Sequence, residues 1–82
     1  MTIEVSEVKK AVVVSYDTNV VIGPHASIQA ANPANDEVLE EKKNIANDGE
    51  AVLTFPLDYS GECVIVVRGS EAGEEDPVTI SL

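Results

Sequence analysis

The residues that could carry catalytic chemistry are few and are scattered along the sequence. A serine hydrolase arrangement would need His25 as the base, with Ser27 as the nucleophile and Asp17 as the orienting acid. A reactive serine of this kind is usually presented on a sharp, glycine-lined turn, and the segment around Ser27 has no such motif. His25 follows Gly23 and Pro24 at the start of an expected strand. We therefore expect a histidine that faces solvent or caps a strand, and we expect no enzymatic activity.

The single cysteine and the single histidine also argue against a metal centre. Structural zinc sites take four ligands, and Cys63 and His25 supply only two. A reactive thiol needs a neighbouring cation or helix N-terminus, whereas Cys63 lies between Glu62 and Val64. We therefore expect Cys63 to be a buried core residue with no internal disulfide, and we expect the protein to use no cofactor.

The carboxylates of one glycine-containing loop, residues 69–76, are the remaining candidates for ligand chemistry. Glu71, Glu74, Glu75 and Asp76 could offer oxygen ligands to calcium, but their spacing matches no EF-hand. The simpler interpretation is an exposed loop of solvated charges. Two carboxylates acting on a glycoside would also need a cleft, for which a domain of this size has little room.

Length and charge restrict the class of protein. With 82 residues the chain fits a single domain, residues 1–82, and its net charge of −10 comes from 15 acidic and 5 basic residues. Binding to nucleic acid or to an anionic membrane needs a positive surface, so both are disfavoured, whereas a basic protein patch would be attracted. No apolar run is long enough for a signal peptide or a membrane span. Together with the lone cysteine, this favours synthesis in a reducing cytoplasm.

Alternation of apolar and polar residues with a period of two predicts a chain made of strands. The expected strands occupy residues 2–8, 11–16, 25–31, 50–55, 63–68 and 78–82. The first strand loses its alternation near Glu7, which indicates a bulge or kink there. The strand at 63–68 is apolar on both faces, which predicts a central position in its sheet. About seven short strands at this spacing are typical of a sandwich or small barrel, and we expect an all-β antiparallel β-sandwich.

Two segments admit more than one local structure. Residues 36–43, DEVLEEKK, contain good helix formers, yet they are short for a helix and are flanked by strands. We prefer an edge strand protected by its charges, with a helical turn as the alternative. Residues 20–22 are apolar and stop at Gly23 and Pro24, so they form either a short strand or a loop that closes one end of the sandwich.

The strongest turn signal is the Asn-Asp-Gly sequence at residues 47–49. It separates residues 43–46 from the alternating strand at 50–55. Asp-Gly between two such runs commonly forms a tight hairpin, so we expect these two segments to pair with each other. Pro56 should end the second strand, because proline has no amide hydrogen to donate to a neighbouring strand.

The stretch from Asn47 to Val67, NDGEAVLTFPLDYSGECVIVV, resembles bacterial and bacteriophage immunoglobulin-like modules. The shared pattern is an Asp-Gly turn, an alternating strand, a short corner with tyrosine and glycine, and a second alternating strand. Similar cores occur in intimin-like repeats and in the transthyretin-like regulatory domains attached to carboxypeptidases. The chain departs from antibody domains: it has no tryptophan and no second cysteine, and Tyr59 lies four residues before Cys63 rather than two. The resemblance implies an immunoglobulin-like antiparallel β-sandwich of about seven strands, used for display, spacing or adhesion.

Within that group, a small domain with no evident export signal looks most like a bacteriophage virion component, such as a capsid decoration protein. The resemblance implies a location in the virion and a partner in the major capsid protein or another virion protein, with a homo-oligomer also open. The expected attachment residues are Thr2, Ile3, Val5, Lys9 and Lys10. The acidic loop would then be the exposed tip.

Two other functions stay open. A small acidic domain suits a nucleic-acid mimic that blocks a DNA-binding host protein, although the carboxylates are spread along the chain rather than set in one stripe. A carbohydrate-binding or cell-surface adhesion module would need exposed aromatic platforms, for which Tyr16 and Tyr59 are the candidates.

Overall fold

The computed structural model describes residues 1–6, 8 and 10–82. Its seven strands are β1 (Thr2–Ser6), β2 (Ala11–Ser15), β3 (His25–Asn32), β4 (Glu37–Ala46), β5 (Glu50–Thr54), β6 (Glu62–Gly69) and β7 (Val78–Ser81). Within these described residues, no helix has the length and apolar character needed to cross a membrane.

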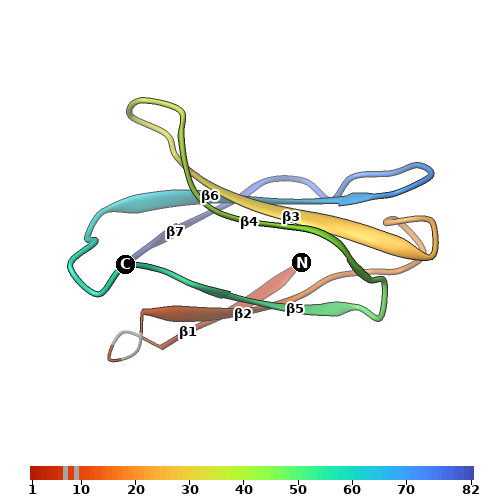
Figure 1. Cartoon of the computed structure of the whole chain (residues 1–82), viewed down its shortest axis with the longest axis horizontal. Coiled ribbons are helices and arrows are strands. Elements are labelled where there is room, and N and C mark those ends of the chain that lie inside the picture. Colours follow the sequence, from red (N-terminus) through yellow and green to blue (C-terminus); the bar gives the residue numbers. More distant parts are fainter. Residues whose placement is uncertain (7, 9) are drawn as a thin grey trace.

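The strands form two antiparallel sheets that lie face to face (Figure 1). One sheet has the order β1-β2-β5 and the other has the order β4-β3-β6-β7. The chain changes sheet between β2 and β3, between β4 and β5, and between β5 and β6. The predicted all-β antiparallel β-sandwich of about seven strands is confirmed.

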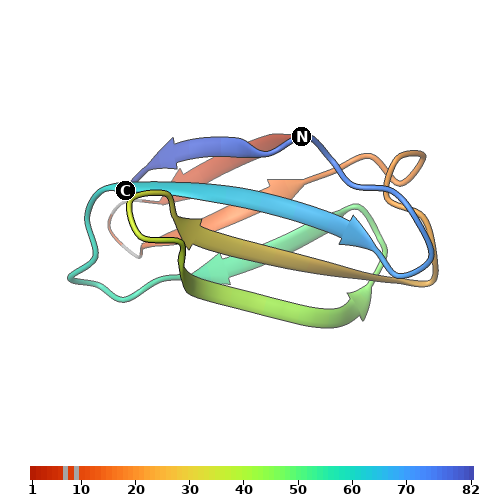
Figure 2. The same ribbon diagram turned by 90° about the horizontal axis from the view of Figure 1, so that it is seen from above.

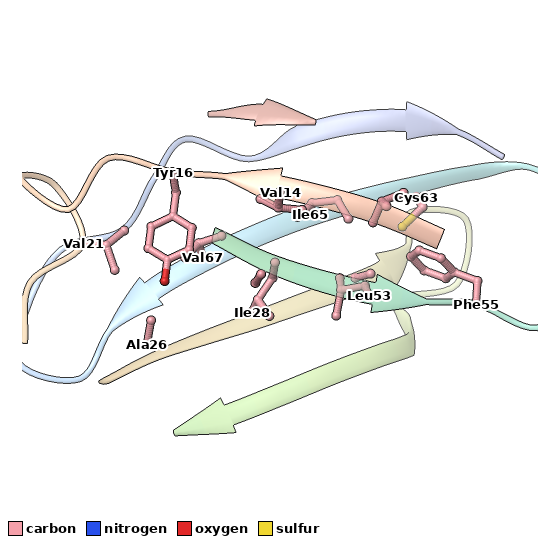
Figure 3. Close-up of a cluster of buried hydrophobic side chains, with 13 residues drawn as sticks. Val14, Tyr16, Val21, Ala26, Ile28, Leu53, Phe55, Cys63, Ile65 and Val67 are labelled. Carbon is pink, nitrogen blue, oxygen red and sulfur yellow. The ribbon is translucent and has the colours of Figure 1, made fainter. Parts of the chain in front are cut away.

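The core lies between the two sheets because each central strand turns every second side chain inward. Val12 and Val14 of β2 and Leu53 of β5 are fully buried, as are Ile28 of β3 and Ile65 of β6. Figure 3 shows members of this cluster, contributed by strands of both sheets. Burying each aliphatic side chain stabilises the fold by about 1.5 to 3 kcal/mol. Apolar packing is therefore the main interaction between the sheets.

Strand β6 is central in its sheet, as its two apolar faces predicted. It lies between β3 and β7 and turns Cys63, Ile65 and Val67 into the core. Val64 and Val66 lie on its other face and are half-buried. This burial on both faces explains why the strand carries almost no polar residues in its middle.

Strand β4 is an edge strand, so the preferred interpretation of residues 36–43 is confirmed and the alternative helical turn is wrong. Its register with β3 shifts between Ala26 and Ile28 and again between Ala30 and Ala31. Such irregularities, combined with the charged side chains of β4, protect an edge against pairing with other chains.

Residues 20–22 form a loop that closes one end of the core, rather than a strand of either sheet. Val21 is fully buried at the same end of the core as Tyr16 (Figure 3). The N–H of Ile22 donates a hydrogen bond of 2.9 Å to the carbonyl oxygen of Ala72. Gly69 lies directly under this crossing, where a Cβ atom would overlap the carbonyl oxygens of Ile22 and Ala72. The loop between β2 and β3 is thereby joined to the acidic loop.

The prediction of a hairpin around residues 47–49 is wrong, because β4 and β5 belong to different sheets and do not pair with each other. β4 pairs with β3, and β5 pairs with β2. The turn is held by distant loops instead: the Asn47 side chain donates to the carbonyl oxygens of Val21 and Gly23, at 2.9 and 2.8 Å. At the end of this turn, the N–H of Tyr16 donates a hydrogen bond of 2.9 Å to the carbonyl oxygen of Gly49. These contacts direct the chain across the sandwich rather than back along the same sheet.

Candidate functional site

The residues considered for a hydrolase site are not assembled into one. His25 begins β3 with an exposed side chain, and its N–H donates to the hydroxyl of Ser70 at 3.3 Å. The carboxylate of Asp17 accepts a hydrogen bond of 2.8 Å from the N–H of Asn19. In the described part of the chain, no hydrogen bond joins the side chains of His25, Ser27 and Asp17. These contacts assign His25 and Asp17 to strand and turn structure.

Cys63 is fully buried in the core, as predicted. Burial raises the pKa of its thiol from 9.0 to about 11, because a thiolate would be poorly solvated there. The thiol is therefore neutral at physiological pH. Its immediate role is to pack against the apolar side chains of both sheets.

The acidic loop is only partly the free, solvated loop that the sequence predicted. Glu74 forms a salt bridge of 2.8 Å with Arg68. The side chain of Glu75 is only 12% exposed, and its carboxylate lies 3.4 Å from the amino group of Met1. The same carboxylate accepts a hydrogen bond of 3.3 Å from the N–H of Asp17. Among the described residues, no three carboxylate, histidine or cysteine side chains are grouped in a way that could hold a metal ion.

The predicted attachment residues on the N-terminal segment are only partly described. Thr2, Ile3 and Val5 belong to β1, which ends at Ser6. Lys9 lies outside the described residues, as does the bulge or kink predicted near Glu7. Lys10 follows with a left-handed backbone (φ 50°), and its carbonyl oxygen accepts a hydrogen bond of 2.8 Å from the N–H of Phe55. The structure therefore places three of the five predicted residues on one strand.

That strand borders an open long side of the sandwich, which we call the β1/β7 rim. β1 ends the three-stranded sheet and β7 ends the four-stranded sheet. Figure 2 shows the red β1 and the blue β7 along the same side of the molecule. The inward-facing side chains of the rim are apolar but differ in burial. The side chain of Met1 is buried, Val5 is exposed, and the others are half-buried: Ile3, Val78, Ile80 and Leu82. The rim is thus a line of incompletely covered core between two sheet edges.

The sequence analysis missed the part of this surface that β7 contributes. The alternation of Val78, Ile80 and Leu82 predicted a strand but gave no information about its neighbours. One feature of the sequence could have indicated it, because residues 78–81 carry no charged side chain, unlike the charged β4. Edge strands in natural proteins usually carry charge, so an uncharged edge strand leaves its outward backbone groups open to pairing.

The two tyrosines considered for sugar binding differ in position. Tyr16 is only 8% exposed and lies in the core, so the expectation that it could be an exposed platform is wrong. Tyr59 borders a surface hollow of about 480 Å³ at one end of the sandwich, between residues 32–34 and 59–62. Its ring lies at an angle of 25° to that of Phe55, with the centroids 6.4 Å apart. Its hydroxyl donates a hydrogen bond of 2.6 Å to the carbonyl oxygen of Glu62.

Comparison with known proteins does not assign the chain to a family. No family model, no curated protein and no solved structure matches it. The functional argument therefore depends on the surface of this sandwich alone.

Proposed function

We propose that this protein is a non-enzymatic structural module that attaches to the surface of a protein assembly, most concretely a bacteriophage capsid or tail. In that role it would stabilise the particle or display its own exposed loops. The observation that carries this proposal is the β1/β7 rim, where two sheet edges and partly exposed core side chains lie together. Exposed apolar surface beside unpaired strand edges is typical of protein-binding sites.

The position of the acidic loop is compatible with such a role. Residues 69–76 project at the end of the sandwich away from the C-terminus (Figure 1). A module attached along its long side would leave this end exposed. With a net charge of −10, the rest of its surface would resist non-specific association with nucleic acid and with other acidic proteins.

Sedimentation with virus particles tests the proposal. Purified protein would be mixed with expanded capsids and with separated virion fractions, and the bound fraction would be measured across a range of protein concentrations. We expect saturable binding with a stoichiometry related to the symmetry of the particle. Failure to bind any capsid or virion fraction would refute the proposal.

The nucleic-acid mimic has less support from the structure. Mimicry of a phosphate backbone needs carboxylates at regular spacing along one surface. Glu4 lies on β1, Glu41 on β4 and Glu62 on β6, so these carboxylates are divided between the two sheets. Two more, Glu74 and Glu75, have cationic partners in the chain itself.

A further inference from the structure

We propose that the β1/β7 rim binds its partner by strand addition to β7, and that the added segment alternates apolar residues with lysine or arginine. The inference rests on the proposed function for the kind of partner, a protein of an assembly, and goes beyond it in naming the mode of binding and the chemistry of the bound segment. It follows from the hydrogen-bond pattern of β7, from the side chains of the rim and from the distribution of charge.

The hydrogen-bond pattern shows which groups of β7 are free to pair. Gly61 and Leu82 exchange two backbone hydrogen bonds, of 3.1 and 2.9 Å. Because bonded and non-bonded pairs alternate in an antiparallel ladder, Ile80 and Val78 also direct their N–H and C=O groups toward β6. The corresponding groups of Thr79 and Ser81 therefore point away from the sheet. Among the described residues β7 is the last strand in its sheet, so these groups can pair with an added strand.

The other outer strand of this sheet is far less suitable. β4 has two register shifts and a sequence rich in glutamate and lysine, both of which hinder regular pairing. β7 pairs with β6 over four successive residues without a shift and contains no charged side chain and no proline. A strand added to β7 would therefore extend a regular, uncharged ladder.

The side chains of the rim explain why apolar residues should occupy every second position of the bound segment. Ile80 and Leu82 face inward and are packed against the core, yet they are only partly buried. In a strand paired with β7, every second side chain would also point inward, beside these residues and toward Ile3 of β1. An apolar side chain at those positions would complete the burial of Ile3, Ile80 and Leu82. The remaining side chains would face solvent on the outside of the sheet.

The charge around the rim favours lysine or arginine at those outward positions. Neither β1 nor β7 contains a cationic side chain, and the amino group of Met1 is already paired with Glu75. Glu62 lies opposite Ser81 on the outer face of the four-stranded sheet, and Asp76 lies just before β7. Lys43 and Arg68 instead border a hollow of about 340 Å³ on the outer face of the four-stranded sheet. A basic segment is attracted to such a rim, whereas a second copy of this chain would bring ten more negative charges.

A short peptide and a pair of proline variants test the inference. The probe is acetyl-Lys-Val-Thr-Val-Lys-Val-Lys-amide, with the same peptide N-methylated at alternate residues as a control of equal charge. Thr79→Pro removes an outward N–H from β7 without removing a hydrogen bond to β6. Thr54→Pro is the matched control. The N–H of Phe55 donates to the carbonyl oxygen of Lys10, just before β2, so the N–H of Thr54 points toward the open edge of β5.

We expect the wild-type protein and Thr54→Pro to bind the probe equally in calorimetric titrations. Thr79→Pro and the N-methylated probe should each weaken binding about tenfold or more. Amide hydrogen exchange of Thr79 and Ser81 should slow when the probe is bound. Equal binding by both variants and both probes would show general charge attraction and overturn the inference. A wild-type dimer that Thr79→Pro dissociates would also overturn it, since a second copy would then occupy the rim.

Capsid sedimentation of the same variants separates this inference from the proposed function. If Thr79→Pro binds capsids as well as the wild type does, attachment does not use β7 and the inference fails while the proposed function stands. If no variant binds capsids but the probe still recognises β7, the proposed function fails and the mode of binding stands.

Discussion

The side-chain amide of Asn47 donates a hydrogen bond of 2.9 Å to the carbonyl oxygen of Val21, a residue on a different loop. A second bond from the same nitrogen, of 2.8 Å, reaches the carbonyl oxygen of Gly23. One side chain thus connects the turn between β4 and β5 with the loop between β2 and β3. Because both connections pass from one sheet to the other, Asn47 holds the sheets in register at this end.

We expect Asn47→Asp to lower the free energy of unfolding by about 2 to 3 kcal/mol. A carboxylate cannot donate to the two carbonyl oxygens and would be repelled by them. Asn44→Asp is the control, because it makes the same change of charge at an exposed position of the neighbouring strand β4. Urea denaturation of the two variants measures the difference. Equal stabilities would show that the Asn47 contacts do not hold the turn.

A comparison of the two tyrosines tests the burial of Tyr16. Its hydroxyl is buried and has no hydrogen-bond partner among the described residues, whereas that of Tyr59 donates to the carbonyl oxygen of Glu62. Tyr16→Phe should leave the stability unchanged or raise it, and Tyr59→Phe should lower it by about 1 kcal/mol. Thermal unfolding of both variants provides the measurement, and a loss in Tyr16→Phe as large as that in Tyr59→Phe would contradict this assignment.

The buried thiol predicts a loss of stability in alkali. Burial raises the pKa of Cys63 from 9.0 to about 11, so the folded protein holds the proton more tightly than the unfolded chain does. This contribution is fully present below pH 9 and is lost as the pH rises toward 11, by roughly 2 to 3 kcal/mol. Urea denaturation under reducing conditions at pH 8 and pH 11 measures it. Cys63→Val should show a smaller alkaline loss than the wild type, and an identical loss would exclude the thiol as its source.

Gly69 provides a test of the crossing between two loops. Any side chain at this position would collide with the backbone of Ile22 and Ala72, which are themselves hydrogen-bonded. Gly69→Ala should therefore destabilise the protein by about 1 to 3 kcal/mol, and it should accelerate amide exchange at Ile22. Denaturation and hydrogen exchange measure the two effects. Unchanged values for both would mean that the loops do not pack closely at Gly69.

Local sequence pattern was sufficient to locate most strands. The alternation in residues 25–31 and 50–55 predicted β3 and β5 closely, and it correctly assigned Ala26, Ile28 and Leu53 to the core. The charges of residues 36–43 correctly favoured an edge strand over a helix. These features are readable from sequence because side-chain direction in a strand depends only on whether a position is odd or even.

The same pattern could not determine which strands pair. An Asn-Asp-Gly turn at residues 47–49 is compatible with a hairpin and with a crossing between sheets, and the choice depends on contacts to Val21 and Gly23, more than twenty residues away. The burial of Tyr16 depends likewise on the loop that closes the same end of the core, where Val21 lies beside it (Figure 3).

The composition and alternation of this chain by themselves determined an acidic, all-β protein with one buried cysteine. Only the tertiary structure decided that β1 and β7 lie at the same open side (Figure 2). It also decided that the outward backbone groups of Thr79 and Ser81 have no partner strand among the described residues. The reason is physical. Alternation of apolar and polar residues is a property of neighbouring positions in the sequence, whereas a strand lies at the edge of a sheet only when no other strand pairs with one of its two sides. That depends on packing between segments far apart in the chain.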